Sequence, residues 1–199
     1  MKKFELTNEF IANRFGTKLF RIRALVEFGD VEAGELGGYV EKESNLGHDD
    51  NAWVYGNARV YGDALVYDNA RVYDNAWVYG DAQVSGDARV YGNAWVYGDA
   101  QVSGDARVCG DARVCGNGDY AYAHGFGSVN RTTTFFRLKD GGVGVRCGCF
   151  YGTLAQFRDK IRETHGETKK AQEYLMLADL MELRFEEDEN EVGNRKYVE

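Results

Sequence analysis

Residues 51–116 read NAWVYG NARVYG DALVYD NARVYD NAWVYG DAQVSG DARVYG NAWVYG DAQVSG DARVCG DARVCG, which are eleven consecutive hexads without a gap. Valine occupies the fourth position of every hexad, from Val54 to Val114, and alanine the second. Gly-Asp, Gly-Asn or Asp-Asn pairs join the hexads, and these residue types tolerate a positive φ. Each hexad therefore predicts a short extended piece followed by a corner.

Side chains alternate between the two sides of an extended segment, so Val and Ala of one hexad point the same way. Because both are small and apolar, we expect them to face inward and the residues that flank Val to face outward. Three hexads close one turn of a triangular prism with 18 residues, and each turn hydrogen-bonds to the next at about 4.8 Å. The repeat therefore predicts a mainly β protein built as a parallel solenoid.

The repeat resembles the hexapeptide-repeat left-handed β-helix family, in which an aliphatic residue is followed four positions later by a small one. Val54 with Ala58 and Val60 with Ala64 show this spacing. The resemblance implies a left-handed parallel β-helix with three hexads per coil. The left hand comes from the resemblance alone, because parallel crossovers are in general right-handed.

The segments on either side of the repeat predict end caps, which solenoids need because an open coil end exposes unpaired backbone groups. We expect an N-terminal β cap over residues 1–36, with a strand at residues 18–25. The β-helix is expected over residues 37–130, with residues 37–50 as an irregular first coil and a two-residue insertion before Ala52.

Residues 131–199 predict a small α+β cap. Residues 132–139 and 143–149 form a hairpin pattern around Asp140-Gly141-Gly142. Thr153 and Gln156 form a capping box at the start of a first helix, and Gly166 is placed to end it. A second helix is expected from about residue 168 to residue 185, followed by an acidic tail over residues 186–199.

Composition excludes several classes of protein. The 199 residues carry a net charge of −8, and no polybasic segment is present, which disfavours general nucleic-acid binding. No apolar run approaches the roughly 20 residues that span a bilayer, so no membrane association is expected. Glu5 and Glu9 interrupt the N-terminus where a signal peptide is apolar, and four cysteines fit a reducing compartment, so we expect a cytoplasmic protein.

Stacking each hexad on the one three hexads earlier places like side chains in outward columns on two of the three prism faces. Tyr, Trp and Arg dominate protein interfaces, so these columns are the predicted binding surface. On the first face the candidate residues are Trp53, Arg71, Arg89, Tyr55, Tyr73 and Tyr91. On the second face they are Arg59, Trp77, Trp95, Tyr61, Tyr79 and Tyr97. The third face is more polar and carries Leu65, Gln83 and Gln101 in one column and Tyr67, Ser85 and Ser103 in the other.

Three interpretations of the aromatic columns stay open. The rings can form ladders that stabilise the solenoid itself, because like aromatic residues stack one coil apart. They can mediate a homo-oligomer, or they can bind a distinct partner such as a host protein or a small nucleotide-like ligand.

The segments LFRIRAL, AGELGGYVEKESNL, TTTFF and CGCFYGTL, with the repeat between them, resemble a group of uncharacterised phage and prophage proteins that carry a hexapeptide solenoid. This resemblance implies origin and architecture. Our leading hypothesis is a non-catalytic, phage-derived binding protein that blocks or sequesters a host component, for example as a counter-defence inhibitor. A self-assembling structural scaffold is the alternative.

Catalysis is the third hypothesis. Many hexapeptide-repeat proteins are acyltransferases that use a coil histidine as base, but His48, His124 and His165 all lie outside the repeat. Only His124, at the end of the solenoid, is placed to act as a general base. A zinc site would need all four cysteines to converge. We therefore expect no catalytic residue, no metal and no cofactor.

Overall fold

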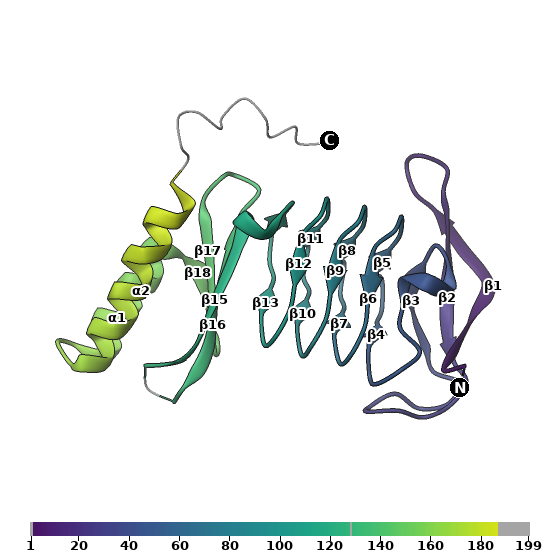
Figure 1. Cartoon of the computed structure of the whole chain (residues 1–199), viewed down its shortest axis with the longest axis horizontal. Helices are drawn as coiled ribbons and strands as arrows, with labels where there is room; N and C mark the ends of the chain where they lie inside the picture. Colours follow the sequence, from purple (N-terminus) through teal and green to yellow (C-terminus); the bar gives the residue numbers. More distant parts are fainter. Residues whose placement is uncertain (1, 128, 187–199) are drawn as a thin grey trace.

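The computed structural model describes residues 2–127 and 129–186 and shows a solenoid between two end caps (Figure 1). The eleven hexads form eleven two-residue strands, which stack in parallel into three faces. In the first eight hexads, each valine pairs with the valine three hexads further on, as Val78 pairs with Val96. The valines and alanines of the hexads are buried in one continuous core. The predicted β-solenoid with three hexads per turn is confirmed.

We name the faces by their strands. The first face contains β4 (Trp53–Val54), β7 (Arg71–Val72), β10 (Arg89–Val90) and β13 (Arg107–Val108). The second face contains β5 (Arg59–Val60), β8 (Trp77–Val78), β11 (Trp95–Val96) and β14 (Arg113–Val114). The third face contains β6 (Leu65–Val66), β9 (Gln83–Val84) and β12 (Gln101–Val102).

The corners between hexads use the left-handed backbone region, as the glycines predict. Gly98 has a φ of +63°, and a Cβ there would lie 2.3 Å from the carbonyl oxygen of Cys115 in the next coil. Two hexads end in aspartate instead, and Asp68 and Asp74 adopt the same positive φ. Their carboxylates accept hydrogen bonds from the amides of Gly86 and Gly92, which joins these corners to the coil above.

The N-terminal cap continues the second face. Strands β1 (Phe4–Ala12) and β2 (Lys18–Ala24) form an antiparallel hairpin, and β2 pairs with β3 (Leu36–Val40). Strand β3 then pairs in parallel with β5, so the sheet order is β1-β2-β3-β5-β8-β11-β14. Val40 pairs with Val60, a separation longer than three hexads, which confirms the irregular first coil and its two-residue insertion.

The C-terminal sheet is larger than the predicted hairpin. Strands β16 (Arg131–Arg137) and β17 (Val143–Cys147) confirm the hairpin, but β15 (Tyr120–Phe126) and β18 (Phe150–Thr153) flank it in a four-stranded antiparallel sheet. Strand β15 lies in the range 37–130 that was predicted to be solenoid, but it pairs with β16 instead. The C-terminal sheet therefore begins before the predicted boundary at residue 130. Short 3-10 helices at Glu43–Asn45 and Asn117–Asp119 lie at the two ends of the repeat.

The sheet lies between the solenoid and two helices, α1 (Leu154–His165) and α2 (Lys169–Phe185) (Figure 1). Neighbouring side chains of β16 point to opposite sides. Phe136 packs in the solenoid core, and Phe135 packs in a second core with α1 and α2. The Thr153 hydroxyl accepts from the amide of Gln156, as the capping box predicts. The predicted acidic tail, beyond Glu186, lies outside the described residues.

Candidate functional site: the aromatic and arginine columns

The second face carries a column in which two arginines enclose two stacked indoles. Trp77 and Trp95 lie parallel, with ring centroids 4.9 Å apart. The guanidinium of Arg59 lies 4.9 Å from the Trp77 ring, and that of Arg113 lies 4.1 Å from the Trp95 ring. The parallel pairing of β5, β8, β11 and β14 sets this order, because it places the residue before each valine in one line. Both indoles are half-buried.

A column of tyrosines runs beside it. Tyr61, Tyr79 and Tyr97 stack with centroids 5.0 and 5.2 Å apart. Tyr61 also contacts the edge of Trp77 at 6.4 Å, and Tyr79 contacts the edge of Trp95 at 6.3 Å. Tyr61 and Tyr79 keep partly exposed rings, whereas Tyr97 is only 8% exposed. The expectation that Tyr97 lies on the surface is wrong. The buried Tyr97 ring stacks on Tyr79 and thereby supports the tyrosine column.

The first face is less aromatic than the sequence predicts. Tyr73 and Tyr91 stack at 4.7 Å, and Arg71 bonds to Asp30 of the N-terminal cap at 2.9 Å. Tyr55 donates to the same Asp30. Arg89 is exposed and has no ion pair within the described part of the chain.

Trp53 is not a surface residue, and its prediction as a binding residue is wrong. The side chain is completely buried, because Phe4 and Phe28 of the N-terminal cap cover it with ring centroids 6.2 and 5.3 Å away. Trp53 therefore joins the cap to the first coil.

These distances show that the columns are ladders. Each ring covers a face of the next one, and stacked or edge-to-face pairs add about 0.5–1.5 kcal/mol beyond their area burial. Ladder formation accounts for part of the aromatic surface, and Tyr61, Trp77, Tyr79 and Trp95 stay partly accessible.

The comparison with known families agrees with this geometry. The family model described as the YdcK beta-solenoid repeat matches residues 52–68, 64–80, 82–98 and 100–116. The chain is a β-solenoid repeat protein. A comparison with curated proteins finds no match.

The tip of the β1–β2 hairpin, which extends this solenoid protein's second face, was not predicted as part of the binding surface. Phe15 is 69% exposed, although it is a large apolar residue. Arg14 stacks over Phe15 and lies close enough to Tyr61 and Tyr79 for its charge to act on both phenols. An aromatic residue at a hairpin turn is the signal that could have indicated this surface.

The buried ladder rings predict an unusual alkaline titration. Burial raises the pKa of Tyr55 and Tyr61 to about 12, and burial also raises the pKa of Tyr73, Tyr79 and Tyr91. Because the folded pKa exceeds the unfolded value near 10, this contribution to stability is complete below about pH 10 and is lost as pH rises toward about 12. Absorbance near 295 nm should therefore show two groups among the 13 tyrosines. A native titration that superimposes on the one in denaturant would contradict the partial burial of these five phenols.

His124, Cys147 and Cys149 lie apart from the ladders, whereas Cys109 and Cys115 take the next positions in the two tyrosine columns. His124 is exposed on β15, with Nδ1 2.9 Å from the Thr132 hydroxyl and 3.7 Å from Asp105. Cys109 is buried, and Cys115 is exposed. Within residues 2–127 and 129–186, no three His, Cys, Asp or Glu side chains form a group suited to a metal ion. In the same residues, no helix is both long enough and apolar enough to cross a membrane.

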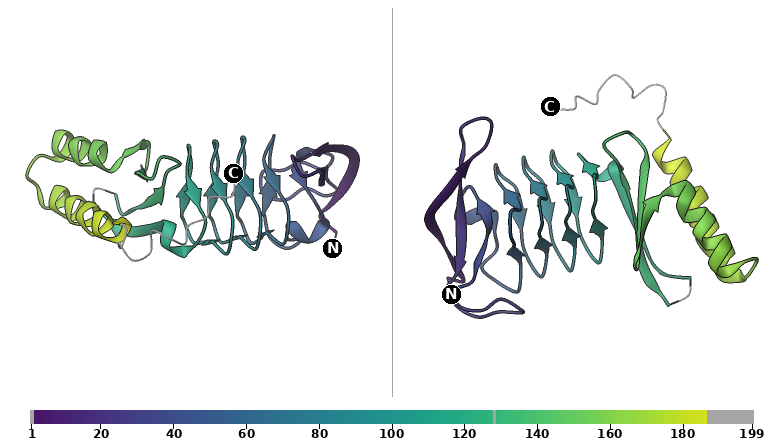
Figure 2. Two further views of the ribbon diagram at one scale, coloured as in Figure 1. Left: turned by 90° about the horizontal axis from the view of Figure 1, so that it is seen from above. Right: turned by 180° about the vertical axis from the view of Figure 1, so that it is seen from behind.

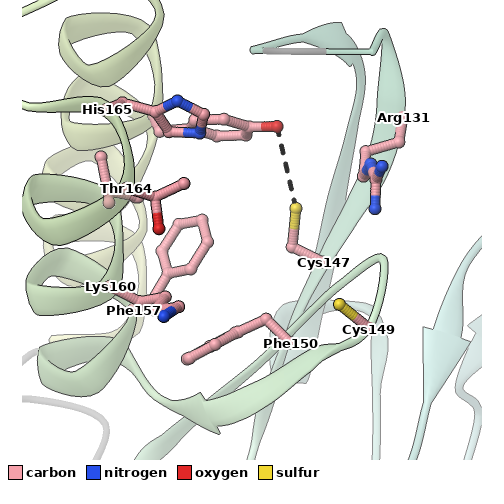
Figure 3. A pocket seen from close by; sticks show the side chains of 10 residues that line it. Arg131, Cys147, Cys149, Phe150, Phe157, Lys160, Thr164 and His165 are labelled. Carbon is pink, nitrogen blue, oxygen red and sulfur yellow. Dashed lines mark hydrogen bonds between the residues drawn. The ribbon is translucent and has the colours of Figure 1, made fainter.

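A pocket in the C-terminal unit was also missed (Figure 3). It lies between α1 and the sheet, with a volume of about 220 Å³, and Cys147 and Cys149 line it. The two cysteines do not lie on one strand, because β17 ends at Cys147 and Gly148 turns the chain with a φ of +58°. The Cys147 thiol is 3.9 Å from the Tyr174 hydroxyl.

Proposed function

We propose that this β-solenoid repeat protein is a non-catalytic binding protein that holds a macromolecular partner on its second face. The observation that best supports this proposal is that the second face is continuous with the N-terminal hairpin, since one sheet runs from β1 to β14. Half-buried Trp77, Trp95 and Tyr79 lie on the solenoid, and exposed Phe15 lies on the hairpin. Tyr, Trp and Arg in such a cluster are the residues that carry most binding energy at protein interfaces.

A protein partner fits this surface better than a small ligand does. The ladder is an extended row of ring edges, and the described pocket lies elsewhere, in the C-terminal unit. The net charge of −8 does not favour a nucleic acid. The similarity of the end segments to phage and prophage proteins supports a host component as the target, bound in the cytoplasm and thereby blocked or sequestered.

Self-assembly into a scaffold is the competing use of the same face. Both coil ends are covered, because Phe4 and Phe28 of the N-terminal cap pack on Trp53 of the first coil and the C-terminal sheet contacts the last coil. The amide of Arg107 donates to the Thr134 hydroxyl, and the amide of Lys139 donates to the carbonyl of Asp111. A scaffold therefore cannot grow by stacking coil on coil, and the ladders of the second face are the surface it would use for side-by-side contacts.

Site-specific photo-crosslinking separates these two uses. Benzoylphenylalanine at position 79 lies on the second face, and the matched control at Ser85 occupies the same hexad position on the third face. In a bacterial lysate, we expect adducts with a different protein from position 79 and none from position 85. Adducts only with further copies of this chain would support the scaffold, and equal adducts from both positions would overturn the proposal.

A further inference from the structure

Helix α2 has a second apolar surface that its packing does not use. Met176, Leu180 and Leu183 are 71%, 54% and 66% exposed. Their spacing of four and three residues places them on one line of the helix. A surface helix normally presents polar residues there.

This exposed stripe lies directly opposite the buried one. Tyr174, Ala178 and Met181 face the sheet and α1 in the second core. At 100° per residue, the centre of the buried side is about 180° from Met176. Figure 2 shows α1 and α2 side by side at the end of the molecule farthest from the N-terminal cap. The stripe therefore points outward, away from the other described elements.

Charges beside the stripe are arranged for a symmetric contact. Glu173 and Arg184 lie eleven residues apart, along the same edge as Leu180. Glu173 accepts from the amide of Gly127, and Arg184 donates to the carbonyl of Asn117. Neither has an ion pair among the described residues, and three helical turns separate them, so they do not reach each other within one chain.

One arginine offsets part of the negative charge on the opposite edge. Arg158 of α1 lies 2.8 Å from Asp179 and 2.8 Å from Glu182. Both acids are therefore paired within the chain, and the three side chains together present one net negative charge to a second helix rather than two.

We propose that α2 pairs with α2 of a second copy in an antiparallel, two-fold symmetric dimer. The midpoint of Glu173 and Arg184 lies between residues 178 and 179, and that of Met176 and Leu183 lies between residues 179 and 180. One two-fold axis thus serves both pairs to within about one residue, or 1.5 Å. Glu173 of each copy then meets Arg184 of the other, Met176 meets Leu183, and the two copies of Leu180 meet at the centre.

Such a dimer joins two molecules by their C-terminal ends. The second faces of both solenoids stay uncovered, so this inference is independent of the proposed partner. Three apolar side chains from each copy form a small interface, and small interfaces give weak, concentration-dependent association. We therefore expect a reversible dimer rather than a permanent one.

Sedimentation velocity across about 1 to 200 µM protein measures this association in the concentration range of weak interfaces. The wild-type chain of 22.3 kDa should shift toward twice its mass as concentration rises. Leu180→Glu should weaken the dimer at least about 100-fold, because the two-fold axis brings two buried charges together. Leu36→Glu is the matched control, since Leu36 is also an exposed leucine, in the N-terminal cap.

A charge exchange tests the antiparallel geometry. Glu173→Arg alone and Arg184→Glu alone should each weaken the dimer, whereas the double variant should restore it. Restoration requires a second chain, because the two residues are too far apart to pair within one helix. A monomer at all concentrations, or equal association of the wild type and Leu180→Glu, would overturn the proposal.

Discussion

Replacing Trp53 by alanine is expected to lower the free energy of unfolding by about 3–5 kcal/mol, the range for a fully buried large aromatic residue. Trp53 has no exposed surface, and Phe4 and Phe28 pack against it from the N-terminal cap. Alanine would leave a cavity where the cap meets the first coil. The cap should therefore loosen together with the loss of global stability.

Trp95→Ala is the matched control, because residues 51–56 and 93–98 have the identical sequence NAWVYG. Trp95 is half-buried and loses only its ladder contacts with Trp77, Tyr79 and Arg113, so we expect a smaller loss of about 1–2 kcal/mol. Chemical denaturation monitored by circular dichroism measures both variants. Equal losses of unfolding free energy in the two variants would show that the complete burial of Trp53 does not determine its contribution to stability.

The repeat made most of the solenoid predictable. A valine and an alanine at fixed positions of every hexad determine the inward side chains, and the corner residues determine the turns. Because three hexads complete one turn, residues that are 18 positions apart stack in one column. The neighbours of Trp77, which are Arg59 and Trp95, could therefore be predicted from numbering alone. The two helices were also predictable, because Thr153 and Gln156 mark a helix start by local chemistry.

Contacts between distant segments were not predictable in the same way. Trp53, Trp77 and Trp95 sit in identical hexads, yet only Trp53 is buried, because residues near the N-terminus cover it. Strand β15 follows the repeat directly, but pairing with β16 places it in the C-terminal sheet. The exposed stripe on α2 was not predicted, because the buried residues of α2 alone account for the apolar spacing expected of a helix with one packed side.

Conversion of the second face into a copy of the third should abolish partner binding while the solenoid stays folded. The combined change is Trp77→Gln, Trp95→Gln and Tyr79→Ser. The hexads DAQVSG on the third face show that Gln and Ser fit these positions. Loss of the stacked and cation–π contacts should lower stability by about 2–4 kcal/mol. Loss of three central interface residues should weaken partner binding about 100-fold or more.

Affinity isolation from a bacterial lysate, followed by native mass spectrometry, tests the binding face most directly. The wild type, this triple variant and a third-face control with Gln83→Ala, Ser85→Ala and Gln101→Ala are compared at a temperature where circular dichroism shows all three folded. We predict one additional protein mass bound to the wild type and to the control, and none bound to the triple variant. The same mass bound to the triple variant would contradict a role for the Arg, Trp and Tyr columns in binding.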